Sequence, residues 1–320
     1  MQLDIENARR FSEEPVIQAV HSEDDIILTC LANGTGVKAI KLSALKLFFA
    51  GDITDLDTVD KTSLVAAVNE IFDDVSILKT RTALFTFNCA GLHNSIYRGK
   101  DVTEYLTDGT LWKRINGSDG FGLFEDLWIG DTITVSSKVY RIAAFDYWLH
   151  CGDTECTTHH IVLVPDANMY SAKMNDSNIT TGGYVGSKMY TTYIADAKTT
   201  IDSAFGSAHI LNHRALLTNA IASDKASGWA WYDSTVDLMN EPMVYGHNAW
   251  GAHHGYETAA DKGQLPLFAL EPSRICNRAH WWLRDVSSGT SFARVTGDGN
   301  AVSNGASNSL GVRPAFGIKA

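Results

Sequence analysis

Cysteine and histidine side chains that could bind a metal lie close together near the middle of the chain. Cys151 and Cys156 are followed by His159 and His160, and thiolate and imidazole are common zinc ligands. Zinc sites usually take a second ligand pair from farther along the chain, and only residues 253–254 offer one. The spacing therefore does not predict a metal, and histidines at turns are the alternative.

Motifs for catalysis are missing from the sequence. The pattern Gly-x-Ser-x-Gly of a nucleophile elbow is absent, and the glycine-rich stretch 117–122 lacks the Lys-Ser/Thr ending of a phosphate loop. We therefore expect a protein that is not an enzyme, with no catalytic residue, no metal and no cofactor. A polysaccharide-acting enzyme stays open as an alternative, because glycoside hydrolysis depends on a distance between carboxylates that a sequence does not give.

A polar segment near the C-terminal end offers side chains suited to recognition. Between Trp282 and Gly311, apolar residues alternate with hydroxyl, amide and charged residues. Such diversity on short strands suits adaptable ligand recognition, and an ordinary solvated pair of hairpins is the alternative. The candidate ligand-binding residues are Arg284, Asp285, Ser287, Ser288, Thr290, Ser291, Arg294, Thr296, Asp298, Asn300, Asn304 and Asn308.

Four of the eight tryptophans gather in two short segments, as Trp229, Trp231, Trp281 and Trp282. Large aromatic side chains most often fill the interior of loop-rich domains. We therefore expect all four in the core, where they would hold neighbouring loops in place.

Length and charge narrow the function further. The chain has 320 residues, with 26 basic and 37 acidic side chains and a net charge of −11. This balance argues against nucleic-acid binding. No apolar run approaches the length of a membrane span, so we expect no membrane insertion. The five scattered cysteines are typical of reduced thiols made in a cytosol.

Periodicity predicts an α+β fold. The sequence favours a β-rich start with strands over 25–31 and 37–42, joined by a turn at 32–36, and a helix beginning near residue 61. Further strands are predicted over 82–87, 132–145 and 161–165, and further helices over 188–197 and 208–219.

The first predicted helix carries a short heptad pattern. Its apolar residues Leu64, Val68, Ile71, Val75 and Leu78 step by four, three, four and three positions, which is the seam of a coiled coil. The same stripe could instead pack on the domain that follows. We interpret these five residues as an oligomerisation seam, because the preceding hairpin is too small to form a core alone.

The C-terminal motifs resemble those of a known family. Trp281-Trp-Leu-Arg284, followed by Gly311-Val-Arg-Pro-Ala-Phe316, resembles the ending of the C-type-lectin-like domains that include phage variable proteins diversified by retroelements. In that family the segment between the motifs is a displayed, hypervariable ligand-binding surface. The resemblance implies that residues 284–308 are exposed on one face, anchored from below by the tryptophan pair, Val312, Pro314 and Phe316.

Two further segments look like phage structural proteins. Residues 182–243 are similar to such proteins, and residues 55–70 are similar to a segment that recurs in head-fibre and tail-fibre proteins. Glu241-Pro242-Met243 departs from the Glu-Pro-Asn loop of calcium-dependent lectins, so the resemblance does not imply calcium-mediated sugar binding. A single cysteine near the end, Cys276, disfavours the formylglycine-generating branch of the fold.

Together these patterns predict three parts: a β-rich virion-attachment segment (1–50), a short trimeric coiled coil (51–80) and a C-type-lectin-like ligand-binding domain (81–320). The expected function is that of a phage head-fibre or tail-fibre protein on the virion surface, made in the host cytoplasm. Its expected partners are two further copies of itself, other virion proteins through the N-terminal segment, and a host-surface or environmental ligand. A purely structural capsid or tail decoration protein is a further alternative.

Overall fold

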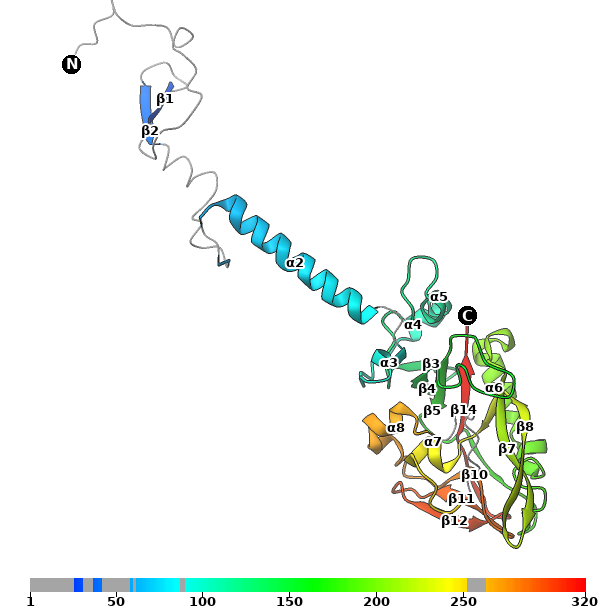
Figure 1. Cartoon of the computed structure of the whole chain (residues 1–320). Coiled ribbons are helices and arrows are strands. Elements are labelled where there is room, and N and C mark those ends of the chain that lie inside the picture. Colours follow the sequence, from blue (N-terminus) through cyan, green and yellow to red (C-terminus); the bar gives the residue numbers. More distant parts are fainter. Residues whose placement is uncertain (1–25, 31–36, 42–57, 60–61, 87–89, 252–262) are drawn as a thin grey trace, which may run out of the picture. The chain divides into compact units, whose positions relative to one another are not determined.

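The computed structural model describes residues 26–30, 37–41, 58–59, 62–86, 90–251 and 263–320 (Figure 1). Residues Met1–Ala83 and Leu84–Ala320 form two compact units. Helices and β-sheets are both present, which confirms the α+β class expected from the sequence. No helix in these ranges is long and apolar enough to cross a lipid bilayer.

The first unit contains the predicted hairpin. Strands β1 (Ile26–Cys30) and β2 (Val37–Lys41) pair antiparallel, with Ile26 opposite Lys41 and Cys30 opposite Val37. The predicted turn at 32–36, and residues 1–25 and 42–57 of the proposed attachment and coiled-coil segments, lie outside the described residues.

Helix α2 (Leu64–Thr86) confirms the helix expected near residue 61. Ser63 caps its N-terminus, because the Ser63 hydroxyl oxygen accepts a 3.0 Å hydrogen bond from the backbone N–H of Ala66. The strand predicted over 82–87 is wrong, since residues 82–86 continue the helix. Residues 64–86 contain no glycine or proline that would end a helix. The helix therefore continues through residues 82–86, although their short apolar pattern resembles a strand.

The predicted seam of α2 lies open in the single chain. Val68, Ile71, Val75 and Leu78 are between 42% and 60% exposed. Val65 and Phe72 lie next to this stripe on the helix and are more exposed still. The side chain of Leu64 lies outside what the structure describes.

Two five-stranded sheets and a long hairpin build the second unit. The first sheet has the order β3-β4-β5-β14-β9, and the second has the order β12-β11-β10-β13-β6. Figure 1 shows the C-terminal strand β14 beside β5 from the first half of the unit. The strands are β3 (Thr132–Val135), β4 (Lys138–Phe145), β5 (Ile161–Pro165), β6 (Tyr170–Lys173), β7 (His213–Ala222), β8 (Lys225–Ser234), β9 (Val236–Leu238), β10 (Trp281–Ser288), β11 (Ser291–Val295), β12 (Ala301–Gly305), β13 (Ser309–Val312) and β14 (Pro314–Ile318).

Short helices connect these strands. The predicted helix over 188–197 is a π-turn (Met189–Tyr193) that leads into α6 (Ala195–Phe205). The helix predicted over 208–219 is wrong: most of it is strand β7, in which His213, Ala215 and Leu217 alternate inward and pair with β8. The other helices are α3 (Ala90–His93), α4 (Thr103–Thr107), α5 (Thr110–Asn116), α7 (Glu241–Tyr245), α8 (Pro266–Leu270) and the 3₁₀ turns Ser207–His209 and Pro272–Arg274.

The core of the second unit contains the tryptophan pair of the C-terminal motif. Trp281 and Trp282 are fully buried, as predicted. Val312, Pro314 and Phe316 are also buried, which confirms that they lie in the interior. Trp229 and Trp231 are not core residues, because they are only half-buried on β8. Strand β8 pairs with β7 alone, so this hairpin is not part of either five-stranded sheet.

Arg313 ties the last motif to the rest of the unit. It is 1% exposed, and its Nε and Nη1 donate to the carbonyl oxygens of Pro165 and Arg274 at 2.8 and 3.0 Å. Its guanidinium lies 5.1 Å from the ring centroid of Trp281. Burial lowers the pKa of Arg313 to about 10. The arginine of the Gly-Val-Arg-Pro motif therefore has a structural role.

Candidate functional site

The predicted ligand-binding residues lie on three neighbouring strands of the second sheet and on the turns between them. Strand β11 is the middle strand, with β10 on one side and the edge strand β12 on the other. Ser291 of β11 lies opposite Gly305, and Val295 lies opposite Ala301. This register puts the β10–β11 turn at one end of the strands and the turn 296–300 at the other.

Arg284 does not lie on an exposed face, so the expectation that it would is wrong. It is 9% exposed, its Nη1 donates to the carbonyl oxygen of Leu238 at 3.1 Å, and its backbone N–H donates to Met239. The positive charge of Arg284 also faces the buried carboxyl of Asp237. Arg284 lies two residues after the tryptophan pair on β10, the central strand of its sheet, and the first four residues of this strand are all buried.

Asp285 is half-buried and serves the structure. Its Oδ2 accepts a hydrogen bond from the backbone N–H of Glu241 at the first position of α7. Burial, with the nearby charge of Glu241 as a second cause, raises the pKa of Asp285 to about 7. Asp285 therefore joins β10 to α7, and it is not an open recognition group.

The turn 296–300 holds three of the predicted residues in one hydrogen-bonded cluster. The hydroxyl of Thr296 donates to Oδ1 of Asp298, and the amide of Asn300 donates to Oδ2 of Asp298 at 2.9 Å. The backbone N–H of Asn300 donates to the Thr296 hydroxyl at 2.9 Å. Asp298 and Asn300 are nonetheless exposed, so this cluster presents a carboxylate and an amide in a fixed arrangement.

The opposite end of the strands holds most of the other predicted residues. Thr290 and Asn308 are exposed there, and the hydroxyls of Ser288 and Thr290 lie 3.3 Å apart. The amide of Asn308 donates to Oδ1 of Asn304 at 3.1 Å. Ser287, Ser288, Ser291 and Asn304 are half-buried. Four residues of β11 separate the two ends, about 13 Å at about 3.3 Å per residue, so the predicted set forms two clusters.

Arg294 lies between the two clusters on β11. It is opposite Trp282 on one side and Val302 on the other, and it is half-buried. Its Nε is buried and has no hydrogen-bond partner in the part of the chain that the structure describes. The hydroxyl of Ser287 is likewise buried and has no hydrogen-bond partner within the described ranges.

Trp250 is a surface aromatic that the sequence analysis does not single out. It is 51% exposed, and its indole N–H donates to the carbonyl oxygen of Ala301 on the edge strand β12 at 3.1 Å. The hydroxyl of Tyr245 donates to Gly299 of the neighbouring turn at 3.0 Å. The signal that could have identified it is a tryptophan between alanine and glycine in a segment rich in turn residues.

The buried carboxylate of Glu241 fixes the position of Trp250. Glu241 is fully buried and accepts hydrogen bonds from the backbone N–H groups of Ala249, Trp250 and Gly251 at 2.8 to 3.1 Å. A Cβ at Gly251 would lie 2.5 Å from Cβ of Asp285, so only glycine fits there. We call residues 246–251 the tryptophan strap, because they run from α7 to the edge of β12.

The cysteine and histidine group near residue 155 is held by local hydrogen bonds. His159 Nδ1 lies 2.8 Å from Oδ2 of Asp146, and His160 Nδ1 lies 2.8 Å from the carbonyl oxygen of Thr158. The thiol of Cys151 donates to Leu149 at 3.4 Å. Within the described ranges, no three or more His, Cys, Asp or Glu side chains are arranged to hold a metal ion. Residues 253–254 lie outside these ranges.

Comparison with known proteins gives two similarities. Residues 243–320 match the family described as "Domain of unknown function (DUF6273)", and this range contains all of the predicted ligand-binding residues. Three xylose isomerases from strains of Cereibacter sphaeroides are each 26% identical over 175 residues, which is 52% of this chain and 38% of theirs. The chain thus covers little more than a third of the length of these curated relatives. No solved structure matches the chain.

Proposed function

We propose that this chain is a phage virion-surface protein, a fibre or decoration protein in which α2 joins three copies and the second unit binds a ligand. The single observation that carries the proposal is the open apolar stripe on α2, which the single chain leaves unpartnered in its described part. Full burial of each such side chain is worth about 1.5–3 kcal/mol. Self-association along the heptad seam would therefore stabilise the helix substantially.

The proposal of three chains on α2 is supported by one d-position residue and by the width of the apolar stripe. Val68 and Val75 take the a positions of the heptad, and Ile71 and Leu78 take d positions. Val65 and Phe72 follow the d positions at e, so apolar surface extends beyond a strict two-residue seam. Valine at a with leucine at d is typical of two strands, whereas Ile71 at a d position and the wider apolar stripe suit a coiled coil with more than two strands.

Recognition by the second unit is supported by its surface at the edge of β12. Trp250 offers an open aromatic ring and is hydrogen-bonded to Ala301 at the start of β12. The turn 296–300, which directly precedes Ala301, offers Asp298 and Asn300. Three such surfaces on one trimer would raise avidity without any new contact. We propose that residues 1–50 attach the trimer to other virion proteins, that the ligand is on the host surface or in its environment, and that the protein resides on the virion after synthesis in the host cytoplasm.

A saccharide is the ligand class to test first. An exposed tryptophan beside amide and carboxylate groups suits the apolar face and hydroxyls of a sugar. The names of the curated relatives also concern a sugar, xylose. Fluorescence titration of Trp250 with neutral and acidic glycans tests the proposal, and equal signals from wild type and Trp250→Ala would argue against it.

A direct test of the virion assignment uses an antibody against the second unit. In immunoelectron microscopy the antibody should label the surface of intact particles. If particles that contain the protein by mass spectrometry carry no label, surface display is contradicted. Light scattering of the full chain should give three times its 34.9 kDa mass. A stable monomer at micromolar concentration would contradict the trimer.

A sugar-converting enzyme is the second candidate, and only the similarity to xylose isomerases favours it. Incubation of the full chain with xylose and divalent metal ions, followed by NMR of the sugar, would detect an isomerised product. We expect no conversion. Release of soluble fragments from host envelope material would instead support a polysaccharide-acting enzyme.

A further inference from the structure

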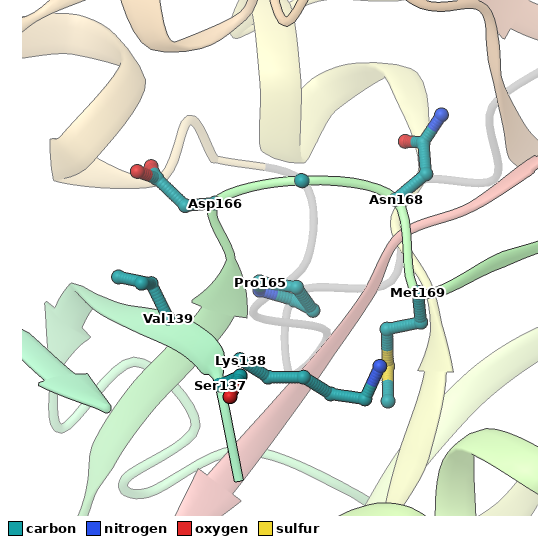
Figure 2. A pocket seen from close by; sticks show the side chains of 8 residues that line it. Ser137, Lys138, Val139, Pro165, Asp166, Asn168 and Met169 are labelled. Atoms are coloured by element: carbon teal, nitrogen blue, oxygen red, sulfur yellow. The ribbon is translucent and has the colours of Figure 1, made fainter. Parts of the chain in front are cut away.

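A cavity in the second unit is lined by residues that do not belong to the predicted ligand-binding set. It has a volume of about 370 Å³ and is lined by the turn that enters β4 and by the loop that leaves β5 (Figure 2). Val139, Pro165 and Met169 give it apolar walls and Lys138 brings an ammonium group, while the side-chain amide of Asn168 is hydrogen-bonded to His280 and Asn277. This volume is within the usual range for sites that hold a small molecule.

Asp166 is the one carboxylate among the residues that line the cavity, and its charge is neutralised by arginines outside the lining. Asp166 accepts two hydrogen bonds from Arg141, at 2.9 and 2.8 Å, and lies 3.9 Å from Arg274. The Arg141 hydrogen bonds, with the charges of Arg141, Arg274 and Arg313, lower the pKa of Asp166. In Figure 2 the Asp166 carboxylate points away from the Lys138 side chain. Three arginines around one aspartate leave a local excess of positive charge, although the whole chain carries −11.

Unused hydrogen-bond donors lie on the same wall. Lys138 stretches along one side of the cavity (Figure 2), and its ammonium has no partner among the described residues. The backbone N–H groups of Asp166 and Met169 donate to Val139 and Val312. The two N–H groups between them, of Ala167 and Asn168, have no partner in the described part of the chain. Successive backbone N–H groups of one loop can together form an anion-binding concavity.

We propose that this cavity binds a small ligand of about monosaccharide size that carries one anionic group, a carboxylate or a phosphate. The ammonium of Lys138 and the N–H groups of Ala167 and Asn168 bind the anion, and Val139, Pro165 and Met169 contact the apolar part of the ligand. The arginines around Asp166 keep its carboxylate from repelling the ligand. The site is on the sheet that contains β4 and β5, so the proposal does not depend on the function assigned to β10–β12.

Calorimetric titration of the full chain tests the site with three probes: glucuronate, glucose 6-phosphate and neutral glucose. We expect at least one anionic probe to bind at least tenfold more tightly than glucose, and the preferred probe decides between carboxylate and phosphate. Raising the salt concentration should weaken anion binding and leave glucose unaffected. No binding of either anion at millimolar concentration, or equal binding of all three probes, would overturn the proposal.

Variants at Lys138 connect the binding to this cavity. Lys138→Gln should weaken the preferred anion at least tenfold, and Lys138→Arg should restore most of the affinity because it keeps the charge. Lys225→Gln, on the exposed start of β8, is the matched control and should bind as wild type does. Thermal unfolding checks that the variants fold. Unchanged affinity in a folded Lys138→Gln variant would place the anion elsewhere.

Discussion

The backbone N–H of Glu241 donates a 2.6 Å hydrogen bond to Oδ2 of Asp285, and this contact joins the start of α7 to the strand β10. Two acidic side chains thereby lie in one buried region. Three backbone N–H groups of the tryptophan strap compensate Glu241, whereas Asp285 keeps the pKa of about 7 that burial imposes. An ionised Asp285 at neutral pH is therefore unfavourable for the folded chain.

Replacement of Asp285 by asparagine should stabilise the protein above neutral pH. A carboxyl with a raised pKa in the folded state lowers the free energy of unfolding as pH rises from about 4 to about 7. Asp285→Asn keeps an oxygen for the Glu241 N–H but removes the charge. We expect a gain of about 1–3 kcal/mol at pH 8 and a smaller change between pH 5 and 7. Urea unfolding measures both, and exposed Asp202→Asn, which should change neither, is the control.

Truncation of Trp250 should weaken ligand binding without unfolding the second unit. Trp250→Ala removes an exposed ring and one hydrogen bond to a carbonyl oxygen, so its stability loss should stay near 1 kcal/mol. On a glycan array we expect at least tenfold weaker binding. Ile96→Ala, which shortens another exposed apolar side chain, should bind normally. If both variants bind like wild type, the edge of β12 is not the recognition surface.

A lysine in the α2 seam should prevent the proposed trimer from forming. Ile71→Lys places a charge at a d position, where association would bury it, whereas Asn69→Lys places the same side chain on the outer face. Light scattering at micromolar concentration should give a monomer for Ile71→Lys and a trimer for Asn69→Lys. Dissociation by both variants would show that general charge, and not the seam, controls assembly.

Natural sequence variation should follow exposure along residues 277–316. If this segment is diversified, substitutions should concentrate at the exposed positions Thr290, Asp298, Asn300 and Asn308. Arg284 should stay fixed, because removing a buried, hydrogen-bonded arginine costs about 3–5 kcal/mol. Sequencing this part of the gene in many particles from one population measures the pattern. Frequent loss of Arg284 would contradict it, and a uniform segment would remove the idea of diversification.

The sequence predicts much of the architecture because period and composition are local properties. The hairpin β1–β2, the strands β3, β4 and β5, the start of α2 and the buried Trp281–Trp282 pair all follow from patterns of a few residues. The wrong predictions concern residues whose structure depends on neighbours that are distant in the sequence. Residues 208–219 have apolar residues that fit a helix, but pairing with β8 makes most of them part of the strand β7. Trp229 and Trp231 are half-buried on a hairpin that is not part of either five-stranded sheet.

The candidate site depends even more on distant contacts. Sequence spacing puts Arg284 and Asp285 among the recognition residues, but contacts with Leu238 and Glu241, more than forty positions away, give them structural roles. The position of Trp250 beside Ala301 is equally non-local. The coiled coil and the ligand both involve molecules other than the single chain, so they stay predictions.

Several side chains from elsewhere in the unit donate hydrogen bonds to main-chain carbonyl oxygens of the C-terminal strands and the turns around them. Tyr245 donates to Gly299, Trp250 to Ala301, Thr180 to Ser288 and Asn168 to His280. Every amino acid carries the same carbonyl group, so these bonds do not depend on which side chain the acceptor residue has. We therefore expect the backbone of this region to keep its shape when exposed side chains on it are replaced.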